Sequence, residues 1–216
     1  MKARIIKRMM TGVLAASLVM APAMSVGATT TSGNTTSAAE TVITSSTSGE
    51  VTTVAEVPST SSVAGVKTTT AGVYLATGVN GSVVTTSVAA IQEGYGLTSS
   101  EKPYAKFSNL DAKKSPLAKQ AIDLAAASQG ATVGPMLNVE LGKMSAGKYS
   151  LLPSDGAAIR LSFGIPKNFA EAGKTYAVVV VRTGGAVSIL ADVDSNPDTV
   201  TFDTTGGAGA YAIIKY

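Results

Sequence analysis

The segment ADVDSNPDTVTFD places oxygen-bearing side chains at a spacing that could bind a cation. Asp192, Asp194, Asn196, Asp198 and Asp203 occupy relative positions 1, 3, 5, 7 and 12 of a twelve-residue window. These are ligand positions of the helix–loop–helix calcium loop, in which carboxylate and carbonyl oxygens surround the ion. The spacing therefore makes this segment a candidate calcium site.

The same segment also suits an acidic turn between two strands. The sixth position of a calcium loop is glycine, and this chain has Pro197 there. Asp203 is a shorter and poorer bidentate ligand than glutamate. Asp and Asn stabilise turns by accepting hydrogen bonds from nearby backbone, and proline fixes φ. We therefore predict a rigid acidic turn from near Ala191 to near Thr199, with calcium binding no tighter than millimolar as the alternative.

Other catalytic groups are scarce in this sequence. The chain contains no histidine and no cysteine, which excludes Ser-His-Asp and Cys-His catalysis and the usual zinc ligand sets. Ser99 and Lys102 have the S-x-x-K spacing of β-lactamases, but Gly156 and Tyr176 replace the last residues of the accompanying S-D-N and K-T-G motifs. We expect no enzyme; a carboxylate-dependent glycosidase is the remaining enzymatic alternative.

Aromatic side chains offer a different chemistry, because they can stack on sugar rings. Tyr95 and Tyr104 lie in the irregular segment IQEGYGLTSSEKPYAKF, so they are the best ligand-binding candidates, although the chain has no tryptophan. The alternative is that both tyrosines anchor loops or the core. The run GGAGA at 206–210 precedes an apolar strand rather than a helix, which favours a turn over a phosphate cradle.

The segments that would position these residues are mostly of strand type. MLNVEL and AIRLSFGI alternate, while TVTFDT and AYAIIKY complete the pattern near the C-terminus. Two hairpins are predicted, one at Asn80-Gly81 and one near Gly184-Gly185. The run AVVVV is apolar on both faces, so we expect a central strand covered by the opposite sheet and by a helix.

One helix is predicted, over about 115–129. Ser115 is placed as its N-cap, Pro116 as its first residue and Gly130 at its end. Its expected packing face consists of Leu117, Ala121, Leu124 and Ala125. The predicted fold is therefore mostly β, an antiparallel immunoglobulin-like sandwich with this one short packed helix.

The last fifty or so residues also carry a family resemblance. A proline-led segment (IPKNF), the sequence GKTY, a Val-rich strand, a Gly turn, TVTF and a closing YAI follow in order. This pattern resembles the C-terminal module of secreted and cell-surface proteins from gut Clostridia and their relatives. The resemblance implies an immunoglobulin-like sandwich of unknown function, and it brings no catalytic residues to this chain.

The N-terminal region has the composition of a targeting segment and a spacer. Residues 1–28 have a basic start, an apolar run and small residues before the cleavage position, which is typical of a secretory signal peptide. Residues 29–70 contain 22 Ser and Thr, so we predict a disordered spacer, a candidate for O-linked sugars, before a domain at 71–216. Cleavage removes four of 17 basic residues and none of 14 acidic ones, leaving a net charge of −1.

These observations predict a secreted module that stays in the extracellular space or loosely at the cell wall. No basic patch remains for nucleic acid, and no membrane insertion is expected after the signal is cleaved. We expect a non-enzymatic binding or structural module without a cofactor, apart from weak calcium, whose partner is an extracellular protein or a glycan. A carbohydrate-binding accessory domain that uses Tyr95 and Tyr104 is the alternative.

Overall fold

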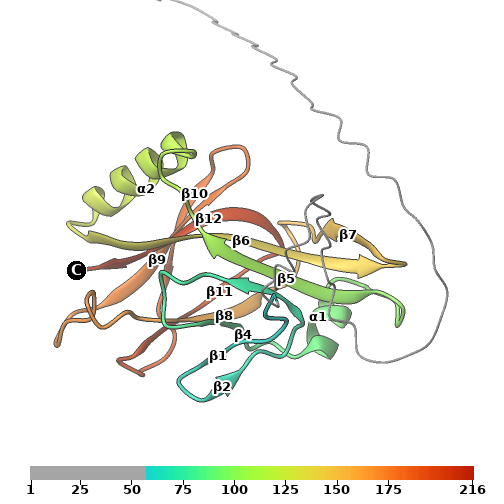
Figure 1. Ribbon diagram of the computed structural model, residues 1–216. Coiled ribbons are helices and arrows are strands. Elements are labelled where there is room, and N and C mark those ends of the chain that lie inside the picture. The colour runs from blue at the N-terminus through green and yellow to red at the C-terminus, as the bar shows by residue number, and fades with distance from the viewer. Residues whose placement is uncertain (1–56) are drawn as a thin grey trace, which may run out of the picture. The chain divides into compact units, whose positions relative to one another are not determined.

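The computed structural model describes residues 57–216. The predicted signal peptide at 1–28 and the spacer residues 29–56 lie outside the described residues. The described part is mostly β and contains two helices, α1 (Val88–Gly94) and α2 (Pro116–Ser128) (Figure 1). Neither helix is long and apolar enough to cross a membrane.

Most strands belong to one large sheet. Its path runs β10-β9-β12-β6-β5-β3, and β7 pairs with the end of β6. Every pair is antiparallel except β3–β5, which is parallel, so the predicted all-antiparallel arrangement is wrong at this edge. The strands are β3 (Gly72–Leu75), β5 (Lys102–Asn109), β6 (Thr132–Ser145), β7 (Lys148–Leu151), β9 (Tyr176–Arg182), β10 (Val187–Ala191) and β12 (Gly207–Lys215).

A smaller antiparallel sheet packs against one face of the large sheet. Its order is β11-β8-β4, and a two-stranded hairpin of β1 and β2 lies next to it (Figure 1). Both sheets contribute to one hydrophobic cluster, so the mostly β prediction is confirmed. The bounds are β1 (Ser62–Val63), β2 (Val66–Lys67), β4 (Ser82–Val84), β8 (Ile159–Gly164) and β11 (Thr199–Thr204).

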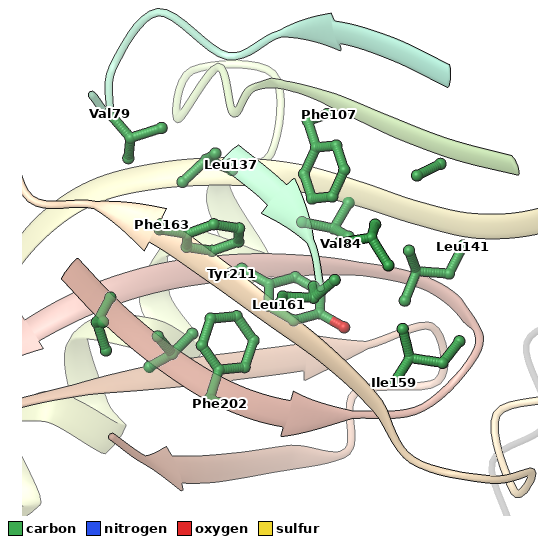
Figure 2. Packing of buried hydrophobic residues seen from close by; sticks show 14 of the residues in the cluster. Val79, Val84, Phe107, Leu137, Leu141, Ile159, Leu161, Phe163, Phe202 and Tyr211 are labelled. Carbon is green, nitrogen blue, oxygen red and sulfur yellow. The ribbon is translucent and has the colours of Figure 1, made fainter. Parts of the chain in front are cut away.

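Aromatic rings fill the space between the two sheets (Figure 2). The Phe163 ring packs edge-on against Phe107 of the large sheet and Phe202 of the small sheet, with centroids 6.1 and 5.0 Å apart. The predicted inward faces of MLNVEL and AIRLSFGI are confirmed, because all their members are buried here: Leu137, Val139, Leu141, Ile159, Leu161 and Phe163.

The strand β9 is apolar on both faces, as predicted. Val178 and Val180 point into the cluster between the sheets, whereas Val179 and Val181 point to the outer face of the large sheet. Helix α2 covers them there and forms a second cluster (Figure 1). The hairpin of β9 and β10 is also confirmed at the predicted glycines.

The predicted helix exists, but its packing face is rotated from the predicted one. Leu117 and Leu124 are 79% and 66% exposed, while Ile122 and Ala126 are buried against β9 and β12. The stripe of α2 that faces the large sheet consists of alanines and one isoleucine, because larger side chains would hold the helix away from the sheet. Gly130 follows the helix with φ of 64°, as its C-terminal position predicts.

The predicted hairpin at Asn80-Gly81 is wrong, because β3 and β4 belong to different sheets. The Asn80 amide donates to the Gly164 carbonyl over 3.0 Å, so this turn pairs with β8 rather than returning along β3. A Cβ at Gly81 would lie 2.4 Å from the Ser62 carbonyl oxygen, which explains the glycine. The prediction of one helix is also wrong: α1 follows β4, with Ser87 as its N-cap.

The end of the predicted spacer belongs to the fold. The Gly72 amide donates to Ser59 over 3.0 Å and the Tyr74 amide donates to Pro58 over 3.2 Å, so residues 58–59 lie along the edge strand β3. Val63 is buried, and the Tyr74 hydroxyl donates to the Thr70 carbonyl over 2.6 Å. The boundary predicted at residue 70 is therefore too late, since structured residues already begin before β1.

Candidate functional site

The acidic segment forms a chain of side chain–backbone turns between two strands. The amide of Asp194 donates to Asp192 Oδ1 over 3.2 Å, and the amide of Asn196 donates to Asp194 Oδ1 over 2.7 Å. The amide of Asp198 then donates to Asn196 Oδ1 over 3.0 Å. Strand β10 ends at Ala191 and β11 begins at Thr199, which confirms the predicted position of the turn.

This turn also protects the outer edge of β11. Asp192 Oδ1 accepts the Thr201 amide over 2.9 Å, and the Val193 amide donates to the Thr201 carbonyl over 2.7 Å. Burial raises the pKa of Asp192, and the hydrogen bonds from the Thr201 and Asp194 amides oppose that shift. The acidic loop therefore supplies partners to backbone groups that an edge strand would otherwise expose.

Asp203, the last residue of the calcium pattern, faces a different partner. It lies opposite Arg160 on the adjacent strand β8, and its two carboxylate oxygens accept hydrogen bonds of 2.8 Å each from the guanidinium. This ion pair lowers the pKa of Asp203. The structure thus gathers Asp192, Asp194 and Asn196 into one loop and holds Asp203 apart from them. Within residues 57–216, no group of three or more His, Cys, Asp or Glu side chains is arranged to hold a metal.

The Tyr95 side chain connects two loops through hydrogen bonds. Its hydroxyl donates to the Ala157 carbonyl over 2.6 Å and accepts the Gly206 amide over 2.7 Å. A Cβ at Gly156 would lie 2.2 Å from the Tyr95 ring, so that glycine permits close packing on the ring. Burial raises the pKa of Tyr95. This geometry fits the loop-anchoring alternative, since both sides of the hydroxyl are occupied by backbone.

Tyr104 lies on the outer face of β5, next to an aromatic partner. Its ring meets the Tyr149 ring of β7 edge-on, with centroids 5.2 Å apart. Tyr149 covers Gly142, where a Cβ would lie 2.7 Å from the Tyr149 ring. Burial, assisted by the nearby Glu140 carboxylate, raises the pKa of Tyr149. The two tyrosines therefore form one packed pair on the sheet surface.

The pairing register extends this pair into a continuous surface. Tyr104 lies opposite Gly142, which in turn lies opposite Leu151, and Met144 lies between Lys102 and Tyr149. One pair further along, Lys106 lies opposite Glu140, and their side chains form an ion pair of 3.4 Å. We call this surface the tyrosine face; it consists of Tyr104, Lys106, Glu140, Met144, Tyr149 and Leu151.

Helix α2 does not cover the tyrosine face. The helix packs on β9, β12, β10 and the first half of β6, where Val133 and Met136 lie beside it. The tyrosine face occupies the second half of β6 together with β5 and β7. Tyr149 and Leu151 are exposed there, so one sheet face has a covered half and an uncovered half.

Half of this surface was not predicted from the sequence, because β7 has no clear turn signal before it. The strands β6 and β7 are joined by Ala146-Gly147, both with positive φ (49° and 74°). Such a turn normally has Asn, Asp or Gly at its first position, and alanine there conceals the hairpin. The alternation in KYSL, which places Tyr149 and Leu151 on one face, is the signal that could have identified it.

Comparison with known proteins adds no further identification. No protein family, no curated protein and no solved structure matches this chain. The geometry of the tyrosine face and the composition of the chain are therefore the observations that bear on function.

Proposed function

We propose that this chain is a non-enzymatic extracellular binding module and that the tyrosine face is its binding surface. The composition supports secretion, since the basic and apolar N-terminal segment is typical of a signal peptide and a Ser/Thr-rich spacer follows. Its partner is an extracellular protein or a glycan, and the net charge of −1 after signal removal favours neither nucleic acid nor an acidic membrane surface.

One observation carries this proposal: the outer face of the large sheet is covered by a helix over one half only. The covered half buries valines and alanines, whereas the uncovered half presents two tyrosines, a leucine and a methionine beside the Lys106–Glu140 ion pair. Rigid aromatic side chains with polar groups around them are the usual composition of a recognition surface. A sheet holds them in fixed positions, which lowers the entropy lost on binding.

The Tyr104–Tyr149 pair favours a glycan-binding module as the second candidate. A tyrosine ring gives a sugar an apolar surface to stack on, and its hydroxyl gives a hydrogen-bonding group. Tyr95 and Tyr104 were the predicted ligand-binding tyrosines. Tyr149 replaces Tyr95 in this proposal, because the Tyr95 hydroxyl is hydrogen-bonded to the backbone of Ala157 and Gly206. Weak calcium binding at Asp192–Asp198 stays a separate proposal, since those side chains also hold the turn.

The proposal is tested by binding of the purified full chain to cell envelope isolated from the source organism. We expect saturable binding that falls at least about tenfold when Tyr104, Tyr149 and Leu151 are replaced together by serine. The matched control replaces Leu117 and Leu124, the exposed leucines of α2, and should bind like the original chain. Equal loss in both variants, or none in the first, contradicts the proposal.

A glycan array with the same proteins separates the two candidates. Binding to defined glycans that is lost in Tyr104→Ala and in Tyr149→Ala, and retained in Tyr216→Ala, establishes the glycan module. Tyr216 is an exposed tyrosine at the opposite end of the sheet, so it controls for general aromatic adhesion. Envelope binding without any glycan binding favours a protein partner.

The finer architecture is also a proposal. The resemblance of the last fifty residues suggests a module of the immunoglobulin-like kind found on gut Clostridia and their relatives. Two sheets that share one core support a sandwich, whereas the parallel pair β3–β5 and the unequal sheets depart from the seven-stranded antiparallel immunoglobulin pattern. An experimental structure with a structural comparison of the strand order tests this assignment.

A further inference from the structure

The strand β10 ends the large sheet, and no strand of residues 57–216 pairs with the outer edge of Val187–Ala191; just beyond it the chain approaches β11, where the Val193 amide donates to the Thr201 carbonyl over 2.7 Å. On its other side, β10 pairs with β9. The Arg182 amide donates to the Ala186 carbonyl over 2.8 Å, which makes these two residues a hydrogen-bonded pair. Antiparallel ladders alternate, so the backbone groups of Val187, Ile189 and Ala191 point away from β9.

Two other edges of the fold are protected, which makes β10 different. Residues 58–59 lie along β3, where Pro58 has no amide to continue a ladder. Asp192 and Val193 provide partners to the outer backbone groups of Thr201 on β11. The sequence of β10, VSILA, contains no charge, no proline and no bulge, which are the usual protections against edge pairing.

The side chains of this edge are apolar as well as accessible. Val187 and Ile189 are 44% and 38% exposed on the outer face, next to the part of the sheet that α2 covers. Neither belongs to the cluster beneath α2. The edge thus offers both unpaired backbone groups and an apolar row that an added strand would cover.

We infer that β10 pairs with β10 of a second copy of this chain. In an antiparallel pairing centred on Ile189, that residue lies opposite itself and Val187 lies opposite Ala191 of the second copy. All three outward-facing residues then exchange backbone hydrogen bonds with the second copy, and no like charges face each other, because β10 has no charged residue. Asp192 lies opposite Ala186 of the second copy, so the two acidic loops stay at opposite ends of the junction.

This pairing is a closed twofold contact, and it has a consequence for binding. The twofold axis passes through the paired Ile189 residues perpendicular to the sheet, so both large sheets keep the same face on the same side. The two tyrosine faces then point in one direction and can engage one extended ligand together. The pairing itself does not rest on the proposed function, since only the edge geometry carries it.

Sedimentation velocity of the full chain tests the pairing. We expect a concentration-dependent dimer, and we expect Ile189→Lys to raise its dissociation constant at least about a hundredfold, because two like charges then face each other. Ile189→Glu should also be monomeric, while an equal mixture of the two variants should form a heterodimer. Leu75→Lys is the control: it places the same charge on an exposed residue of the opposite edge strand β3 and should leave the dimer intact.

The outcomes are decisive in both directions. Thermal melting of each variant verifies that the monomer is folded, which is expected because Ile189 is partly exposed. The inference is overturned by a chain that stays monomeric up to a concentration of about 1 mM. A dimer that survives Ile189→Lys, or a Lys/Glu mixture that does not associate, also overturns it.

Discussion

The strands β9 and β5 belong to the same sheet but differ in the burial of their outer faces. On β9 both faces are buried, because the smaller sheet covers Val178 and Val180 and helix α2 covers Val179 and Val181. On β5 only the inner face is buried, with Ala105 and Phe107 in the core, while the outer face stays accessible.

The difference can be read from the residue types of the two strands. A run of valines can only be accommodated where both faces are covered, whereas alternation of apolar and polar residues marks a strand with one solvated face. The outer face of β5 is unusual because a tyrosine takes part in its polar row and packs on Tyr149 of β7. We therefore expect the part of the outer face beneath α2 to stabilise the fold, and the uncovered tyrosine face to bind a partner.

The largest expected effect comes from a charge placed under the helix. Val179→Asp should prevent folding, because Val179 is fully buried and an unpaired carboxylate there costs several kcal/mol against a total stability of about 5–15 kcal/mol. Ser108→Asp puts the same charge on the outer face of β5 and should remain soluble with a cooperative melt. A Val179→Asp protein that melts cooperatively would contradict the burial of Val179 beneath α2.

The two faces of α2 give the next largest difference. Ile122→Ala should lower the free energy of unfolding by about 2–5 kcal/mol, because the buried side chain leaves a cavity against the sheet. Leu124→Ala removes a mostly exposed side chain and should change it by less than about 0.5 kcal/mol. Urea denaturation measures both, and similar losses would mean that the helix is rotated from the position described.

A smaller effect is expected at the acidic loop. Asp192→Ala should cost about 1–3 kcal/mol, because it leaves the Thr201 amide of the β11 edge without its acceptor. Asp198→Ala keeps that hydrogen bond and should cost clearly less. If calcium raises the melting temperature strongly and Asp194→Ala abolishes that rise, the loop is a metal site rather than an edge cover.

The smallest effect concerns the pH dependence of the Asp203–Arg160 pair. The guanidinium lowers the pKa of Asp203, so the folded state binds its proton less readily than the unfolded chain does. The resulting stability is present above the ordinary aspartate pKa and is lost as the pH falls through the lowered folded value. Both side chains are about half exposed, so solvent screening keeps this contribution the smallest of the four. Asp203→Asn should reduce stability at pH 7 and have little effect at strongly acidic pH; equal losses at both would refute the assignment.

Much of the strand pattern could be predicted from the sequence because alternation and apolar runs are local signals. The buried rows of β6 and β8, the hairpin of β9 and β10 and the limits of α2 followed from such signals. The parallel pair β3–β5 did not, because a parallel pairing joins distant segments and leaves no local mark at the turn. Asn80-Gly81 has hairpin chemistry, yet its partner is β8 rather than the preceding strand.

The candidate site was only partly predictable for the same reason. Tyr104 was identified, whereas its partner Tyr149 became visible only through the pairing of β6 and β7. Tyr95 has a similar local sequence context, but contacts with Ala157 and Gly206 decide that it fastens loops. The sequence spacing included Asp203 in the calcium pattern. In the structure, Asp203 lies opposite Arg160 on β8 and forms an ion pair with it.

Site-specific photo-crosslinking is the most direct test of partner binding at the tyrosine face. A benzophenone amino acid in place of Tyr149 reports contacts at the tyrosine face, and the same group in place of Tyr216 reports contacts at the other end of the sheet. With isolated envelope from the source organism, we expect a saturable adduct from position 149 that excess unlabelled chain suppresses, and no such adduct from position 216. Equal adducts from both positions, or an adduct from position 216 alone, would contradict it.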